Sequence, residues 1–470
     1  STTSEPIRAQ VIEADRAARA NPSSAAIVGD LGVVYHASLF NQQALHAYAL
    51  ATTLDPEAWR PAYYRGLLLE ERGEHEPALQ AFLQVTSVAP AQGHAWFHIA
   101  EIRFKRRELD AAVEGYRRVR ESPATAAAPV GGVTRRVAVP LAAFGDLGLV
   151  RVLLERGARD QAKTEIEQLV RAQPNFGPAR DLQEQLVGRA DRVSHHDGDG
   201  SYLPPVDPLM DAVVARSQQP DLLLKHAALA GRAGDAPWRE FLARRALAVS
   251  PRGLDVLLEM SSMLQAAGRH TEALEFLRQA EAVAPGDHHT LVEEGKTLSE
   301  LGRLEEAEQV LRRAIRVRDA AAEYNLGTVL DRQERWDEAR SHYERALSIN
   351  PFHTRALNNL GVGLDRRGQT PAALALYARA LDIAPADPEV LSNLGSAFLG
   401  KRRYAEAIAV LDRAVTIDPA APNAHNNLGI ALAQSGRLDE AVARFQEALR
   451  LNPRHANARR NLEAIKKLGK

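Results

Sequence analysis

The chain has 470 residues, of which 45% are hydrophobic, 25% charged and only 5% aromatic, a mixture that favours helix over strand and argues against several separate globular domains. Because 59 Lys and Arg balance 60 Asp and Glu, the formal charge of −1 gives no net attraction to nucleic acid or to an anionic membrane surface. The absence of cysteine excludes thiol catalysis, disulfides and thiolate metal sites.

The first residues predict one unpaired helix, and segments of constant length follow it. The helix is expected over residues 6–20, just before Pro22. Prolines then recur every 34 residues in two stretches, except for one step of 66 residues that holds two units, one of which is two residues short and ends at Asp319. These prolines are Pro22, Pro56, Pro90, Pro251, Pro285, Pro351, Pro385, Pro419 and Pro453. A fixed period of this length is typical of a repeat architecture.

Two interruptions divide the repeats. The first, residues 122–140, is rich in Ala, Pro and Gly and is expected to be a loop that leads into an extended helix. The second, residues 194–208, contains three prolines together with Gly and Asp, and it is the predicted boundary between an amino-terminal and a carboxy-terminal block. The final residues, 456–470, predict a polar helix that caps the last repeat.

One unit, residues 354–387, predicts a hairpin of two helices. Two apolar stretches with helical spacing flank a turn at Gly368, and Pro385 ends the second helix. Gly361 and Ala373 are small where the two helices must come close. A single hairpin buries too little apolar surface to be stable alone, so neighbouring hairpins are expected to stack into an all-α solenoid.

The small residues of this unit recur at the same step of 34 in its neighbours. They are Gly327, Gly361, Gly395 and Gly429, and Ala339, Ala373, Ala407 and Ala441. Together with the prolines they resemble the tetratricopeptide repeat family, whose unit has a small residue at position 8, Ala at positions 20 and 27, and Pro at position 32. Ala100 and Val85 depart from this pattern in the early units. The resemblance implies a right-handed superhelix of about eleven helical hairpins with a carboxy-terminal capping helix.

The resemblance also suggests a division of the chain. An amino-terminal block is expected at 1–193, a linker with an irregular helix at 194–219, and a carboxy-terminal block at 220–470 with its capping helix at 456–470. The expected repeats lie at 25–58, 59–92, 93–126, 143–176, 220–253, 254–287, 288–319, 320–353, 354–387, 388–421 and 422–455.

A row of asparagines is the sharpest candidate for a functional site. Asn325, Asn359, Asn393 and Asn427 are 34 residues apart, each is followed by Leu-Gly, and Asn461 continues the step. At 100° per residue the buried stripe of the helix lies roughly 150° from this position, so the amides are expected to point away from the repeat core. An amide both donates and accepts, and a regular row could therefore hold the backbone of an extended peptide.

In the family, the surface that would carry this row is the concave groove. The repeats are similar to the superhelix that precedes the catalytic part of O-linked N-acetylglucosamine transferases, which implies peptide binding by the row. Asn358 and Asn426 neighbour it, and Arg355 adds positive charge. The alternative is that each amide bonds to the neighbouring repeat and only sets the register of the helices. A site that binds the carboxyl terminus of a partner would need Lys or Arg at a position where the row has asparagine. The sequence therefore argues against such a site.

Other candidate sites are weaker. Residues 195–200, with His195, His196, Asp197 and Asp199, partly imitate a calcium loop but have Val206 where the bidentate acid is required, which favours a solvated linker. Basic residues at 105–107, 366–367 and 401–403 fall where first helices end and complement the helix dipole. The chain has no GxSxG, no HExxH and no GxGxxG after a strand, so neither an enzyme nor a cofactor is expected.

The leading hypothesis is a non-enzymatic scaffold that binds an extended peptide or partner protein in the groove. Two alternatives stay open: a structural subunit of a larger or self-associating assembly, and a substrate-recruiting arm of a glycosyltransferase system, against which the polar end at Lys470 argues. No partner nucleic acid and no insertion into a membrane are expected. The Ala and Arg bias suggests a bacterium, with a cytoplasmic location, or a periplasmic or surface location if Ser1 is a processed end.

Overall fold

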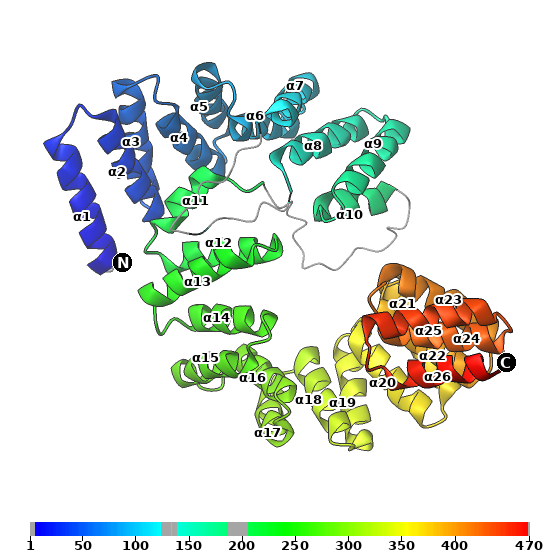
Figure 1. The fold of residues 1–470 in the computed structure, drawn as a ribbon. Helices are drawn as coiled ribbons and strands as arrows, with labels where there is room; N and C mark the ends of the chain where they lie inside the picture. Colours follow the sequence, from blue (N-terminus) through cyan, green and yellow to red (C-terminus); the bar gives the residue numbers. More distant parts are fainter. Residues whose placement is uncertain (1–4, 124–132, 134–138, 187–204, 469–470) are drawn as a thin grey trace. The chain divides into compact units, whose positions relative to one another are not determined.

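A computed structural model describes residues 5–123, 133, 139–186 and 205–468 of the chain. Twenty-six α-helices lie in these ranges and make up two compact units, here called unit 1 (residues 1–267) and unit 2 (residues 268–470) (Figure 1). The predicted all-α solenoid of helical hairpins is confirmed. The division expected at 194–208 stays a prediction, since most of that segment lies outside the described residues.

The described residues of unit 1 form five helical hairpins and four further helices. The hairpins are α2 (Ala25–Ala37) with α3 (Asn41–Leu54), α4 (Trp59–Glu71) with α5 (His75–Val88), α6 (Gly93–Lys105) with α7 (Leu109–Glu121), α8 (Leu141–Glu155) with α9 (Arg159–Ala172), and α12 (Pro220–Arg232) with α13 (Ala236–Val249). The further helices are α1 (Glu5–Ala20), α10 (Gly177–Leu186), α11 (Pro208–Ala215) and α14 (Leu254–Ala266).

Unit 2 begins with α15 (His270–Val283) and continues as five hairpins and a last helix. The hairpins are α16 (His288–Glu300) with α17 (Leu304–Ala314), α18 (Ala320–Arg332) with α19 (Trp336–Ile349), α20 (Thr354–Arg366) with α21 (Thr370–Ile383), α22 (Pro388–Gly400) with α23 (Tyr404–Ile417), and α24 (Pro422–Gln434) with α25 (Leu438–Leu451). The last helix, α26 (Ala456–Leu468), packs against α24 and α25.

The hairpin turns share one residue with a left-handed backbone. Gly368, where the sequence predicts the turn, has a φ of 79°, and the amide of the next residue, Gln369, donates to the carbonyl of Leu364 at 3.0 Å. The equivalent turn of α22 and α23 has Arg402 at a φ of 57°, with the same bond from Arg403 N to Phe398 O at 2.9 Å. The bond to the first helix therefore fixes the turn even where no glycine lowers its cost.

In most hairpins a glycine of the first helix lies against a large side chain of the second helix. The pairs are Gly32 with Tyr48, Gly66 with Phe82, Gly295 with Leu311, Gly327 with Tyr343, Gly361 with Tyr377, Gly395 with Leu411 and Gly429 with Phe445. A β-carbon on Gly361 would lie only 2.7 Å from Cε1 of Tyr377. The recurring glycine thus leaves the space into which the large side chain of the second helix packs.

The departure at Ala100 has a counterpart on the other helix of its hairpin. Where α6 carries Ala100, α7 carries Gly115, and a β-carbon there would lie 2.8 Å from the Ala100 methyl group. In this hairpin the glycine at the close approach is on the second helix instead of the first. Tyr116, the next residue, lies against Gly148 of α8 instead.

The repeat that ends at Asp319 is two residues shorter than the others, and the shortening lies in its second helix. This helix, α17, ends at Ala314 and is shorter than the other second helices of unit 2. Asp319 then caps α18, because its side chain accepts a hydrogen bond from Ala322 N at 2.9 Å. A helix cap therefore replaces the proline at this position.

Residues 205–219, here called the return segment, fold back onto first helices of unit 1. The Tyr63 hydroxyl of α4 donates to the carboxylate of Asp207 at 2.8 Å, and Ser217 Oγ donates to the carbonyl of Ala37 at 2.7 Å. Apolar side chains of α11 join the core formed by α2, α4 and α6. A segment far away in the sequence thus covers the first helices of unit 1.

None of the helices in the described ranges has the length and apolar character needed to cross a bilayer.

Candidate functional site

The asparagine row lies on the first helices of four successive hairpins in unit 2. Asn325 is on α18, Asn359 on α20, Asn393 on α22 and Asn427 on α24, and all four side chains are half-buried. The first helices α20, α22 and α24 pack against one another, and α24 packs against α26. The amides therefore follow one edge of the stack at the interval of one hairpin.

Three amides of this register bridge neighbouring hairpins by the same bond. In each case Nδ2 donates to the side chain that stands one position earlier in the preceding first helix. The bonds are Asn359 to Tyr324 Oη at 3.4 Å, Asn393 to Asn358 Oδ1 at 2.9 Å, and Asn461 to Asn426 Oδ1 at 3.0 Å. These three amides thus set the register between hairpins, as the alternative interpretation of the row expects.

The other two amides of the row lack this bond. The equivalent position before Asn325 is Val292, which offers no acceptor, and before Asn427 it is Ser392. Asn427 instead accepts a bond from Asn426 Nδ2 at 3.3 Å, and Asn325 makes no side-chain hydrogen bond within the described part of the chain.

Each amide of the row keeps a polar atom that reaches solvent. Several amide atoms of the row have no hydrogen-bond partner among the described residues: both atoms of Asn325, Oδ1 of Asn359, Oδ1 of Asn393 and Nδ2 of Asn427. These atoms are not fully buried. A row with one free amide atom per hairpin is chemically able to bond to a backbone laid across it.

The neighbouring asparagines have a different environment. Asn358 and Asn426 are buried, at 3% and 5% exposure, and both atoms of each amide are bonded within the protein, Asn358 Nδ2 donating to Glu389 Oε1 at 3.0 Å. Arg355 is exposed on α20 and forms no ion pair with any residue in the described ranges. Of these three candidates, only Arg355 is accessible to a ligand.

Replacement of single amides is expected to separate the two roles. Asn393→Ala leaves the buried Oδ1 of Asn358 without its donor, which costs about 1–2 kcal/mol of unfolding free energy. Asn325→Ala breaks no hydrogen bond, so a change within about 0.5 kcal/mol is expected. Hydrogen exchange of the α18, α20 and α22 amides in the full chain measures both. Equal losses in the two variants would contradict the register role of Asn393.

Aromatic residues beside the row were not predicted as part of the site. The Tyr324 ring lies 4.8 Å from the His353 ring and 6.1 Å from the Tyr343 ring, measured between centroids. The Tyr343 hydroxyl is buried near Thr328 and Asn359, and burial raises the pKa of Tyr343 to about 12. Tyr324 stands at the same position of its helix as Asn358 and Asn426, and this shared position is the signal that could have identified it.

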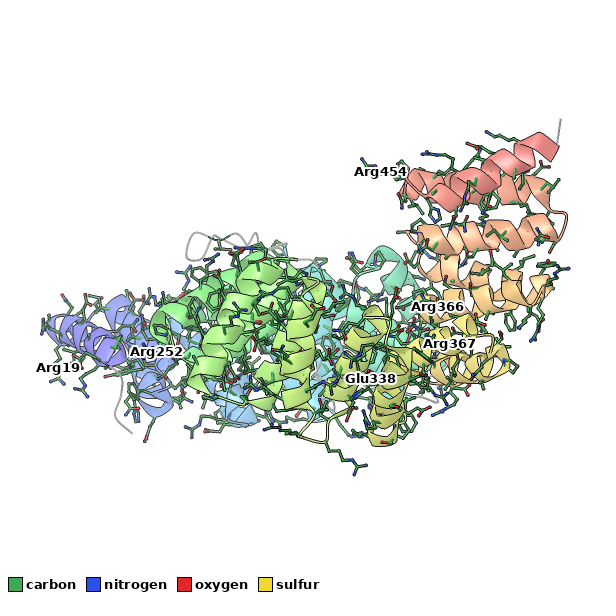
Figure 2. All side chains as sticks on the ribbon, turned by 90° about the horizontal axis from the view of Figure 1, so that it is seen from below. Arg19, Arg252, Glu338, Arg366, Arg367 and Arg454 are labelled. Carbon is green, nitrogen blue, oxygen red and sulfur yellow. The ribbon has the colours of Figure 1, made fainter. Side chains whose placement is uncertain are left out.

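Basic residues at the helix ends serve the fold. Arg366 and Arg367 lie next to each other at the end of α20 (Figure 2). The Arg367 guanidinium lies 4.3 Å from the centre of the Trp336 ring and donates to the carbonyl of Gly363 at 3.1 Å. Its charge thus complements the end of the helix, as the sequence predicts, and also covers an aromatic ring.

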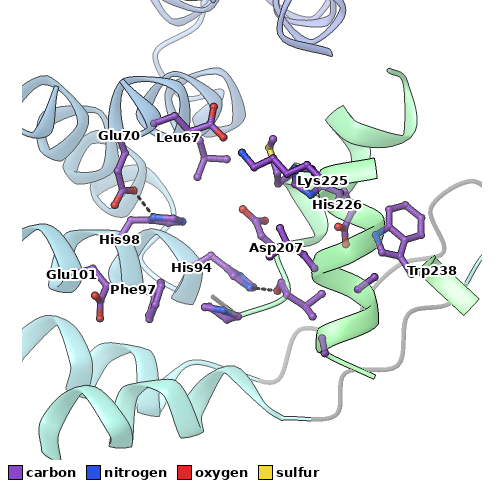
Figure 3. A pocket seen from close by; sticks show the side chains of 18 of the residues that line it. Leu67, Glu70, His94, Phe97, His98, Glu101, Asp207, Lys225, His226 and Trp238 are labelled. Atoms are coloured by element: carbon purple, nitrogen blue, oxygen red, sulfur yellow. Dashed lines mark hydrogen bonds and ion pairs between the residues drawn. The ribbon is translucent and has the colours of Figure 1, made fainter. Parts of the chain in front are cut away.

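Unit 1 contains a second candidate site, a pocket that the sequence did not suggest. It lies between α4, α6, α12, α13 and the return segment, and its volume is about 440 Å³ (Figure 3). His98 Nδ1 lies 2.6 Å from Glu70 Oε2, and the His98 ring stacks on Phe82 at a centroid distance of 4.8 Å. Glu101 accepts bonds from Tyr116 and Arg151, both at 2.7 Å.

The ion pair in this pocket changes the pKa of both partners. Burial alone would lower the pKa of His98, but the charge of Glu70 and its hydrogen bond raise it above its ordinary value. Burial alone would raise the pKa of Glu70, but the charge of His98 and the same bond bring it below its ordinary value. The pH range in which both groups are charged at the same time is therefore wider than it would be at their ordinary pKa values.

The loop candidate at 195–200 lies outside the described residues. Within the ranges that the structure describes, no group of three or more His, Cys, Asp or Glu residues is placed to hold a metal ion.

Family models of the tetratricopeptide repeat match residues 254–320, 318–386, 358–422 and 398–464. Residues 254–464 therefore consist of tetratricopeptide repeats. The similarity to the O-linked N-acetylglucosamine transferase superhelix stays a prediction. No curated protein matches the chain.

Solved structures similar to this chain share little sequence with it. One is the APC/C hetero-tetramer Cut9-Hcn1, with 13% identity, 92% of this chain and 94% of that chain covered, and a TM-score of 0.48. Another is a tetratricopeptide repeat protein from Parabacteroides merdae ATCC 43184, with 16% identity, 53% and 100% covered, and a TM-score of 0.43. A third is YrrB, described as having an unusual peptide-binding site, with 22% identity, 39% and 95% covered, and a TM-score of 0.31.

Proposed function

We propose that this protein-interaction scaffold holds an extended segment of a partner protein along the asparagine row of unit 2. The observation that carries the proposal is the free, solvent-accessible amide atom that each of the four hairpins presents at the same position. An extended segment has unpaired backbone N–H and C=O groups, and amides can bond to both kinds. Recognition of this type follows the backbone and reads few side chains.

The proposal assigns different parts to the asparagines. Asn325 and Asn427 have the amides least committed to the fold, so they are the principal ligand contacts. Asn359 and Asn393 position the hairpins through Nδ2 and offer Oδ1 to the ligand. Asn358 and Asn426 hold their neighbours in place from a buried position.

The proposal places the binding site in unit 2 and not in unit 1, because the return segment covers first helices of unit 1. In unit 1 the return segment packs over first helices, and its hydrogen bonds use Tyr63 of α4 and the end of α2. In unit 2 each described helix packs against helices that are close to it in the sequence. The first helices that carry the row are therefore left for a ligand.

Removal of two amides is expected to weaken binding without loss of structure. In the variant with Asn325→Ala and Asn427→Ala, two hydrogen bonds of about 0.5–1.5 kcal/mol each are lost, so affinity falls about 5-fold to 150-fold. The probe is a set of fluorescent 12-residue peptides selected on the full chain by display, and anisotropy measures their binding. The control is Gln446→Ala, which removes an exposed amide from the second helix α25. Equal affinity of both variants would contradict the proposal.

A photo-crosslinking amino acid tests the same site with the natural partner. Ser396 is exposed on α22, one turn after Asn393 and on the same face, whereas Arg379 is exposed on the second helix α21. Crosslinks in the source cell should form at position 396, not at 379, and should weaken in the double asparagine variant. Crosslinks that join two copies of the chain would instead favour a self-associating subunit.

A further inference from the structure

The pocket of unit 1 has the size and lining of a small-molecule site. Its volume of about 440 Å³ falls within the range of roughly 300–1,000 Å³ that is usual for such sites. Apolar atoms make up most of the lining surface, and Leu67, Phe97, Met210, Leu229 and Trp238 are among the apolar residues. Acidic, basic and histidine side chains also line the pocket, and polar groups of this kind can orient a ligand.

Charge in the lining is predominantly negative. Five carboxylates line the pocket, against the two lysines Lys105 and Lys225. Glu70 is paired with His98, and Glu101 with Arg151. Asp207 has no ion pair with any residue in the described ranges, although it stands at the centre of the lining (Figure 3).

The Asp207 carboxylate is held in place by neutral donors. One oxygen accepts the Tyr63 hydroxyl at 2.8 Å, and the other accepts the backbone N–H of Leu209 at 2.9 Å, where Asp207 caps α11. His94 Nε2 binds the carbonyl of Val206 at 2.8 Å and fixes the preceding residue. A carboxylate can accept about four hydrogen bonds, so Asp207 has lone pairs left for a ligand.

We propose that this pocket binds a small organic cation, with an ammonium or guanidinium group at Asp207 and an apolar portion against Trp238 and Phe97. An anion would meet the carboxylates, and a neutral apolar molecule would remove water from Asp207 without compensating its charge. A cation with an apolar body satisfies both parts of the lining.

The test uses 2-phenylethylamine and its neutral analogue 2-phenylethanol on the full chain. Isothermal titration calorimetry is expected to show binding of the amine at least tenfold tighter than binding of the alcohol. The amine should also change the fluorescence of Trp238, and Trp238→Phe should remove most of this change. Equal binding of amine and alcohol, or binding of neither, would overturn the proposal.

A conservative variant assigns the effect to the charge of Asp207. Asp207→Asn keeps an acceptor for Tyr63 and a good cap for α11, so circular dichroism should stay unchanged while the amine binds at least tenfold more weakly. Asp160→Asn removes an exposed carboxylate of α9 outside the pocket and should leave amine binding unchanged. If Nα-acetyl-lysine amide bound tighter than 2-phenylethylamine, the site would belong to a protein side chain, which would overturn the small-molecule assignment.

Discussion

Replacing Tyr377 by alanine is expected to lower the free energy of unfolding of unit 2 by about 3–5 kcal/mol. The ring is 1% exposed and lies against Gly361, where the two helices of the hairpin come closest. Its removal leaves a cavity that the α20 and α21 backbones cannot close without losing contacts to their neighbours. Hydrogen exchange of the slowest α20 and α21 amides, measured in the full chain, reports the loss.

A second substitution tests whether the contact with Gly361 is the cause. Gly361→Ala is expected to cost about 1–3 kcal/mol, although alanine is the better helix former, because its methyl group meets the ring. The double variant should be more stable than the sum predicts by about 1 kcal/mol or more, since its two alanines can pack together. The hairpin of α12 and α13 has such a buried pair, Ala227 and Ala243. Additive effects would contradict the packing argument.

The variant Glu70→Gln is expected to destabilise unit 1 by about 3 kcal/mol at pH 6. It removes one partner of a largely buried ion pair and leaves the charge of His98 uncompensated. Exchange of the α4 and α6 amides measures the effect. Glu76→Gln, which breaks an exposed pair with Arg106, is the control and should change these amides little.

The same ion pair sets a pH dependence with a defined sign. Because the folded-state pKa of His98 is raised, its contribution is complete below the unfolded value of about 6.5 and is lost as the pH rises through the folded value. The lowered pKa of Glu70 gives a contribution present above about pH 4.3 and lost as the pH falls. Unit 1 should therefore lose stability as the pH rises above about 6.5, and Glu70→Gln should flatten this slope. An unchanged slope in the variant would contradict the role of the pair.

The helical hairpins could be predicted because each rests on contacts between residues close in sequence. Proline and glycine at fixed intervals are sufficient to place turns such as the one at Gly368. The compensation between Ala100 and Gly115 is equally local, but it follows from packing across two helices, which the interval alone does not express. A repeat pattern thus predicts where helices and turns lie better than it predicts which side chains contact each other.

The sites could be predicted only in part. The asparagine row is visible from its spacing, yet whether an amide is free depends on the side chain one position earlier in the preceding hairpin, such as Val292 or Tyr324. The pocket of unit 1 depends on Asp207 meeting Tyr63, and these residues are 144 positions apart. No period in the sequence marks a contact of that kind.

Because of the return segment, unit 1 cannot complete its folding during translation in the same way as unit 2. The first helices of unit 1 leave the ribosome more than a hundred residues before the return segment that covers them. At 5–20 residues per second this interval is on the order of 10 s, during which Tyr63, Tyr64 and Leu67 stay without their final cover. Hairpins of unit 2 need only their immediate neighbours and can form one after another during translation. The amino-terminal hairpins are therefore the part of the nascent chain that we expect to need a chaperone.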